Sequence, residues 1–196
     1  ESAFVVSPGP DGPQVTLHAV ATDAAGHTGQ GEVTINVDRV GPVVKFGGSW
    51  ENYLASRSAA LRGRMRYNLR RLQHAGPVSL EVAANASEAE RDFEAFAAMS
   101  RHRWGRPLDH AFVAFHRKLV PRMFAAGHVL LARLRVGGDV VAMKYDYAYD
   151  GRVWGYQGAW RPEFAKYEVG SVLLCELFQY AIKAGCREYD FLEGDD

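Results

Sequence analysis

Apolar and polar residues alternate along the first part of the chain. The stretches "QVTLHAVATD" and "GEVTINVD" alternate as half-buried strands do. The residues between them, "AAGHTGQ", are typical of a turn, and "VDRVGP" ends the second strand. Residues 1–42 are therefore predicted to form a β-hairpin segment. An isolated hairpin is marginal in water, so this one must pack on other structure or belong to a larger module.

From Trp50 the apolar spacing becomes helical. One stripe of a long predicted helix is formed by Leu54, Leu61, Met65, Leu69 and Leu72. Gly76 and Pro77 end this helix, and the short strand "VSLEVA" follows.

Two more helices follow that strand. Ser87, with Glu90 three residues later, predicts a capping box at the start of the first. The second covers "LDHAFVAFHRKLVPRMFAAG", where Pro121 is expected to interrupt it and Gly127 to close it.

Three β runs then follow, "HVLLARLRV", "VVAMKYDYAY" and "RVWGYQGAW". Gly137-Gly138 and Asp150-Gly151 separate them, and such pairs are strong hairpin signals. We predict an antiparallel meander over residues 128–160. A helix over "KYEVGSVLLCELFQYAIKAG" and a last strand, "REYDFLEG", complete an α+β layout. The strands before and after that helix can lie side by side, joined by a helical crossover.

The start of that helix is a candidate anion site. Gly170 would let a pyrophosphate approach the backbone, Ser171 carries a hydroxyl, and Lys166 would add a positive charge. Ordinary helix capping beside a solvated lysine explains the same residues.

Composition adds few constraints. Hydrophobic residues make up 47% of the 196 residues, and the 23 Lys and Arg balance 23 Asp and Glu, as in a globular protein. Cys175 and Cys186 lack metal or redox spacing, so we expect reduced thiols in a cytoplasmic protein. No apolar run reaches the roughly 20 residues that span a bilayer, and no signal peptide is evident. The chain opens at Glu1 without Met, as a fragment or processed form would.

Five stretches occur in an order typical of one enzyme family. They are "SWENYLASRSAALRGRMRYNLRRLQHAG", "MSRHRWGRP", "LLARLRVGGDVVAMKYDY", "WGYQGAWRPEFAKYEVGSVLLCELFQYAIKAG" and "EYDFLEGDD". Residues 43–196 thereby resemble the GNAT (Gcn5-related N-acetyltransferase) superfamily, and more narrowly its BioF2-like or CelD-like branch, which is related to Fem-type aminoacyl transferases.

The resemblance implies an N-acyltransferase with a GNAT-like mixed sheet, flanked by helices, that contains the antiparallel meander. Because the family continues into further strands after the point where this chain ends, the sheet is expected to lack its C-terminal strands. Acetyl-CoA or another acyl-CoA is implied as co-substrate, without a metal. Its pyrophosphate would lie on the loop that opens the last helix, at Lys166, Tyr167, Glu168, Val169, Gly170 and Ser171. This loop has less Gly and Arg than usual, and Fem-type relatives use other donors.

Acyl transfer to an amine needs a base, a polarised carbonyl and a proton for the leaving thiolate. In the family, the end of the last strand borders the acceptor site, which makes Glu193 the first candidate base. Asp146 is a second candidate, although a solvent-facing Asp explains it as well, and Tyr145 a third candidate. Alternation places Tyr145 and Tyr147 on one face of the strand, either lining a cleft or packing the sheet. Candidate acceptor contacts are His102, Trp104, Tyr147, Tyr156, Gln157 and Asp190.

Arginines are concentrated in the first long helix. They are Arg57, Arg62, Arg64, Arg66, Arg70 and Arg71. Arg57, Arg64 and Arg71 share one face, which is either solvated or suited to an anionic acceptor or surface. Without stacking aromatics or a nucleic-acid motif, sequence-specific DNA binding is not expected.

Several functions remain open. The first is transfer from acyl-CoA to an amine of a small molecule, sugar or cell-envelope precursor. The second is aminoacyl-tRNA-dependent transfer of the Fem type. The third is a non-catalytic interaction module, because residues 1–41 resemble the last strands of bacterial Ig-like repeats and a fusion would explain them.

Overall fold

The computed structural model describes residues 3–9, 12–22, 28–36 and 41–192, with side chains for 41–101 and 105–192. Its contacts divide the chain into two compact units. Residues 42–192 form the larger unit, and residues 1–41 with 193–196 form the smaller one.

The smaller unit contains a three-stranded antiparallel sheet in the order β1-β2-β3. Its strands are β1 (Ala3–Gly9), β2 (Gly12–Thr22) and β3 (Thr28–Asn36). The predicted hairpin corresponds to β2 and β3, which pair from Gln14↔Asn36 to Thr22↔Thr28. The structure adds β1 as a third strand, in a stretch where Pro and Gly hide the β pattern. Residues 23–27 and 37–40, predicted as turn and strand end, lie outside the described residues.

The larger unit is built on a six-stranded mixed sheet in the order β4-β9-β8-β7-β6-β5. Its strands are β4 (Val43–Lys45), β5 (Val78–Val82), β6 (Val129–Val136), β7 (Asp139–Tyr149), β8 (Arg152–Trp160) and β9 (Glu188–Asp190). The predicted meander β6-β7-β8 is confirmed, and so is the crossover that makes β8 and β9 parallel neighbours. This architecture confirms the predicted α+β class with a GNAT-like sheet. The edge strand β4 was missed, because its three residues are too few to show a period.

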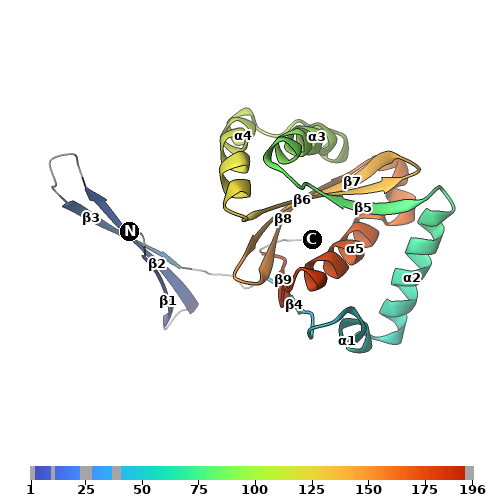
Figure 1. Ribbon diagram of the computed structural model, residues 1–196, viewed down its shortest axis with the longest axis horizontal. Helices are drawn as coiled ribbons and strands as arrows, with labels where there is room; N and C mark the ends of the chain where they lie inside the picture. Colours follow the sequence, from blue (N-terminus) through green and yellow to red (C-terminus); the bar gives the residue numbers. More distant parts are fainter. Residues whose placement is uncertain (1–2, 10–11, 23–27, 37–40, 193–196) are drawn as a thin grey trace. The chain divides into compact units, whose positions relative to one another are not determined.

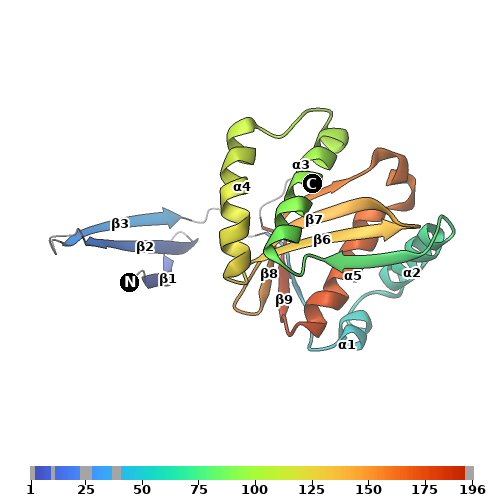
Figure 2. The same ribbon diagram turned by 45° about the horizontal axis from the view of Figure 1, so that its top comes forward.

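Helices cover both faces of this sheet. They are α1 (Trp50–Ala55), α2 (Ala59–Gln73), α3 (Ala86–Trp104), α4 (His110–Ala125) and α5 (Val169–Lys183), with the 3₁₀ turn η1 (Pro162–Tyr167) before α5. Figures 1 and 2 show α3 and α4 on one face and α5, with α1 and α2, on the other. Alternation in β6 fills both cores, because Leu131 packs in the α3–α4 core and Leu130 in the α5 core.

The long helix predicted from Trp50 is in fact two helices. Ser58 accepts a hydrogen bond from the backbone N–H of Leu61 and thereby starts α2. The Arg62 guanidinium holds the break by donating to the carbonyl oxygens of Leu54 and Arg57. Leu54 and Leu61 lie seven residues apart, which is two helical turns, so the apolar stripe runs through the break without showing it.

Two details of the next helices also differ. The capping box of α3 uses Asn85 and Glu88, not Ser87 and Glu90. Pro121 lies inside α4 without interrupting it. Pro removes a single N–H donor, and the surrounding turns keep the helix in place.

Candidate functional site

The start of α5 differs from an ordinary capped helix. Its N-cap residue, Glu168, has left-handed backbone angles of φ 56° and ψ 42°, and no side chain caps the first turn in the part of the chain that the structure describes. No acidic residue lies in that turn either. Gly170 is half-buried, and a β-carbon there would lie 3.4 Å from the Trp160 ring. The backbone N–H groups of this turn can therefore receive an anion.

Three cations lie around this turn. The Arg64 guanidinium is 3.9 Å from the Glu168 carboxylate. The Arg71 guanidinium lies 5.7 Å from the centre of the Tyr167 ring, and the Lys166 ammonium 5.0 Å from it. Positive charge from α2 and η1 thus adds to the positive end of the α5 dipole.

Asp146 occupies the junction of β7, β8 and β9. It is fully buried. One carboxylate oxygen accepts from the Tyr156 backbone N–H at 3.0 Å and lies 3.2 Å from the Lys144 ammonium, and the other accepts from the Tyr189 hydroxyl at 2.8 Å. Burial raises the pKa of this carboxyl. The expectation of a solvent-facing Asp was therefore wrong, because Tyr189 from β9 covers it.

Gly155 allows this arrangement. A β-carbon at that position would lie 2.5 Å from the Tyr189 hydroxyl oxygen. Glycine on β8 thus lets Tyr189 reach across the strand to Asp146. The pairing of β8 with β9 covers Arg152–Trp154, and β8 continues to Trp160.

A hydrogen-bonded aromatic cluster occupies the opposite face of the sheet. The Tyr145 hydroxyl lies 2.8 Å from His116 Nδ1 and 2.9 Å from the Tyr147 hydroxyl. The Tyr156 hydroxyl is 3.4 Å from His116 Nε2. Burial lowers the pKa of His116 and raises the pKa values of the three tyrosines. The cluster is therefore neutral near pH 7, and it connects buried His116 to the half-buried Tyr147 and Tyr156.

The predicted site residues do not all lie together in the structure. Tyr145 and Tyr147 share a face opposite Asp146, as predicted. Val169 packs in the core, so only its backbone can bind an anion. Gln157 is half-buried and pairs with Tyr145 across β7 and β8. Asp190 accepts from the Leu192 backbone N–H at 2.9 Å, and this bond orders the end of β9.

Glu193 lies outside the described residues. His102 and Trp104 lie in the last turn of α3, and their side chains are outside the described part of the chain.

Sequence reasoning missed three residues of these sites. Arg64 and Arg71 were noted as one face of a basic helix, but nothing in the sequence connected that face with the loop at Lys166. Their i, i+7 spacing was the available signal. His116 was missed because a single histidine on the apolar face of a helix is usually a packing residue.

The described residues were also compared with the requirements of a metal site, a membrane-spanning helix and a disulfide. No group of His, Cys, Asp and Glu there has the arrangement of a metal site. None of the helices described is long and apolar enough to cross a bilayer. Cys175 and Cys186 are both free thiols.

Comparison with known proteins identifies a matching family and two similar solved structures. Residues 59–196 match the family "Acetyltransferase (GNAT) domain". No curated protein sequence matches the chain. Among solved structures, FemX superposes with a TM-score of 0.61 at 12% identity, over 83% of this chain and 56% of FemX.

A second structure is the C-terminal domain (DUF2156) of a putative lysylphosphatidylglycerol synthetase from Agrobacterium fabrum. It superposes with a TM-score of 0.51 at 11% identity, over 78% of this chain and 45% of that one. At these identities the two structures are evidence for the fold alone. The present chain spans about half of each of them.

Proposed function

Because the chain belongs to the GNAT acetyltransferase domain family, we propose that it transfers an acyl group from acyl-CoA to an amine. The amine would belong to a small molecule, a sugar or a cell-envelope precursor. The observation that carries the proposal is the start of α5, where an uncapped first turn adjoins three cations.

The start of α5 fits a donor that carries a pyrophosphate. The backbone N–H groups of Gly170 and Ser171 would donate to the phosphate oxygens, and Lys166 and Arg71 would balance their charge. Arg64 would exchange its exposed contact with Glu168 for the ligand, at little cost because exposed ion pairs are weak.

The acceptor would lie on the face of Tyr147 and Tyr156. In the reaction the amine nitrogen bonds to the acyl carbon, the carbon–sulfur bond breaks, and the leaving thiolate takes up a proton. The Tyr147 hydroxyl is half-buried and backed by Tyr145 and His116, so it can donate a hydrogen bond to the acceptor and pass protons along the cluster. Glu193 is the proposed base, with His102, Trp104, Gln157 and Asp190 as proposed acceptor contacts.

Asp146 has a different proposed role. Its carboxylate is fully buried and already holds the Tyr156 backbone, Lys144 and Tyr189. We assign it the positioning of β8 against β9 and not direct proton transfer.

Calorimetric titration of the purified chain with acetyl-CoA and with CoA tests the donor. Saturable binding with a dissociation constant in the micromolar range is expected. A folded chain that binds neither compound would contradict the proposal. Release of CoA thiol with a panel of amines would then identify the acceptor class.

A second candidate is aminoacyl transfer of the Fem type. The FemX-like fold and the arginines of α2 favour it. Its test is binding of aminoacyl-tRNA that weakens steeply with salt, because phosphate contacts release counterions. Binding of tRNA in place of CoA would move the assignment to this candidate. Binding of neither would favour a non-catalytic module.

A further inference from the structure

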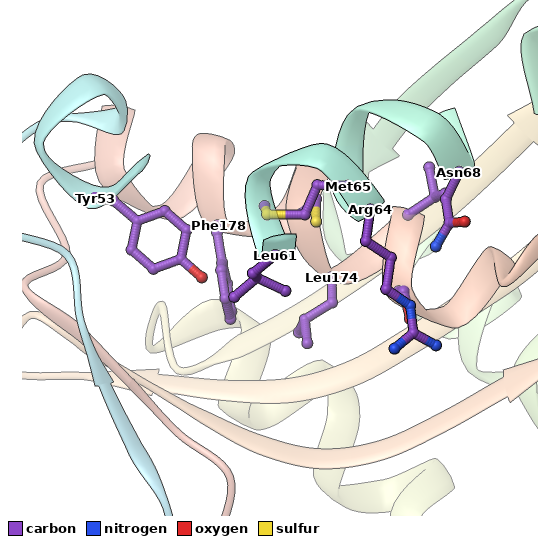
Figure 3. A pocket seen from close by; sticks show the side chains of 10 residues that line it. Tyr53, Leu61, Arg64, Met65, Asn68, Leu174 and Phe178 are labelled. Atoms are coloured by element: carbon purple, nitrogen blue, oxygen red, sulfur yellow. The ribbon is translucent and has the colours of Figure 1, made fainter. Parts of the chain in front are cut away.

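A cavity of about 250 Å³ lies between α1 and α2 on one side and α5 on the other. Figure 3 shows Arg64 and Asn68 at one end and Tyr53 and Phe178 at the other. Leu61, Met65 and Leu174 form much of the apolar wall between these ends. The cavity is thus polar at one end and apolar along its length.

Two polar side chains line the cavity without a hydrogen-bond partner among the described residues. They are the Asn68 amide and the Tyr53 hydroxyl, and each of these two residues is only 4% exposed. Their polar atoms are not among the fully buried atoms without a partner, which in the described residues are Asp92 Oδ2 and Arg133 Nε, so both groups are accessible from the cavity. Both groups border the cavity, so a bound molecule there can supply the missing partners.

The polar end of the cavity suits an anion. The Arg64 side chain is 69% exposed at this end, and the Ser171 hydroxyl also lines the cavity. A guanidinium and an amide N–H₂ together offer the donors that a planar carboxylate accepts. Cys175 lines the apolar part, and burial raises the pKa of its thiol to about 12, so it adds no negative charge near pH 7.

We propose that this cavity binds a small amphiphilic carboxylate. Its carboxylate would contact Arg64, Asn68 and Ser171, and its apolar chain would extend towards Phe178 and the Tyr53 hydroxyl. An apolar cavity of about 150 Å³ holds benzene, so one of about 250 Å³ fits a ligand of roughly ten non-hydrogen atoms.

The site adjoins the proposed donor site and shares Arg64 with it. The donor site uses the backbone N–H groups of the first turn of α5. The cavity uses the side chains of Ser171, Leu174 and Cys175, which lie on the stripe of α5 that faces α2.

Calorimetric titration of the full chain with octanoate tests the proposal, with octanol and octylamine as comparisons. One saturable site is expected, with a dissociation constant of about 0.1–1 mM for a ligand of this size. Octanol and octylamine should bind at least about tenfold more weakly, because they lack the anionic head. Equal binding of the three compounds, or no binding of octanoate, would overturn the proposal.

Paired variants locate the site. Leu174→Trp fills the cavity and should weaken octanoate binding at least about tenfold, whereas Tyr180→Trp, at an exposed position of the same helix, should leave it unchanged. Arg64→Gln should weaken binding about fivefold and Arg66→Gln, outside the cavity on α2, less than twofold. Loss of binding in both members of a pair would contradict this location.

Cysteine alkylation gives a second reading that needs no variant. At pH 9 iodoacetamide should modify Cys175 more slowly when octanoate is present, while Cys186, which does not line the cavity, should react at an unchanged rate. Equal protection of both thiols, or of neither, would overturn the assignment.

Discussion

The helices α3 and α5 both follow strands of the large sheet, yet their first turns are arranged in opposite ways. In α3, the Asn85 side chain accepts from the Glu88 N–H at 2.9 Å, and the Glu88 carboxylate accepts from the Ala84 N–H at 3.0 Å. In α5, the described residues supply no side-chain cap and no acidic residue in the first turn. Cations from α2 and η1 lie beside it instead.

The difference separates a helix start that is complete in itself from one suited to a ligand. A capping box satisfies the first donors and places a negative charge on the positive end of the dipole. The start of α5 keeps both its donors and its positive field available. The starts of α3 and α5 can therefore be distinguished by whether side chains accept from their first N–H groups and neutralise the helix dipole.

The largest effect is expected from giving α5 the acidic character of α3. Gly170→Glu should weaken CoA binding about 100-fold, because the added carboxylate would fill the space beside the first turn of α5 and repel the phosphates. Gly170→Ala is the control. Its β-carbon would make an ordinary contact of 3.4 Å with Trp160, so affinity should stay within about threefold. Calorimetry on folded samples measures both, and equal affinities in the two variants would contradict the comparison.

Removing the cap of α3 should affect stability alone. Asn85→Ala deletes the acceptor for the Glu88 N–H and should lower the free energy of unfolding by about 1 kcal/mol. Urea denaturation measures the change, and calorimetry should show unchanged CoA affinity. A loss of CoA affinity would mean that the two helix starts are not independent.

Removing one cation should have a smaller effect on CoA. Arg71→Gln should weaken binding about fivefold, because one charge beside Tyr167 is lost while the N–H groups of α5 remain. The control is Arg66→Gln. Arg66 is exposed on the same helix, and its replacement should change CoA affinity less than twofold. If the two variants behave alike, the α2 charge acts as a diffuse field.

The smallest effect concerns pH. The hydrogen bond from the Ala84 N–H lowers the pKa of Glu88 below its usual value. Because the folded pKa is the lower one, this bond stabilises the fold fully above about pH 4.5 and is lost as the pH falls through the folded pKa. Urea midpoints between pH 7 and 3 should therefore fall less steeply in Glu88→Gln than in the unaltered chain. Parallel curves would exclude the assigned role of Glu88.

Much of the fold follows from local signals. Gly137-Gly138 and Asp150-Gly151 determine the two hairpins of the meander, and the turns at both pairs form where the sequence predicts them. Elements that depend on distant partners were missed or misjudged. β4 exists because Val43–Lys45 pair with β9, and Asp146 is buried because Tyr189 crosses Gly155 to reach it.

The candidate site shows the same limit. Gly170, Ser171 and Lys166 were proposed from one continuous stretch, because a glycine-led helix after a strand is a local pattern. Arg64 and Arg71 come from a helix about 100 residues earlier in the chain, and only the packing of α2 beside η1 and α5 brings them to the same place. His116 meets Tyr145 through the packing of α4 on the sheet.

The most direct test is to follow the backbone amide resonances of the two helix starts by NMR during a CoA titration. Large shifts are expected for the amides of residues 169–171, and little change is expected for those of residues 86–88. CoA binding that leaves residues 169–171 unmoved, or that moves both helix starts equally, would contradict the claim that α5 begins as a phosphate site.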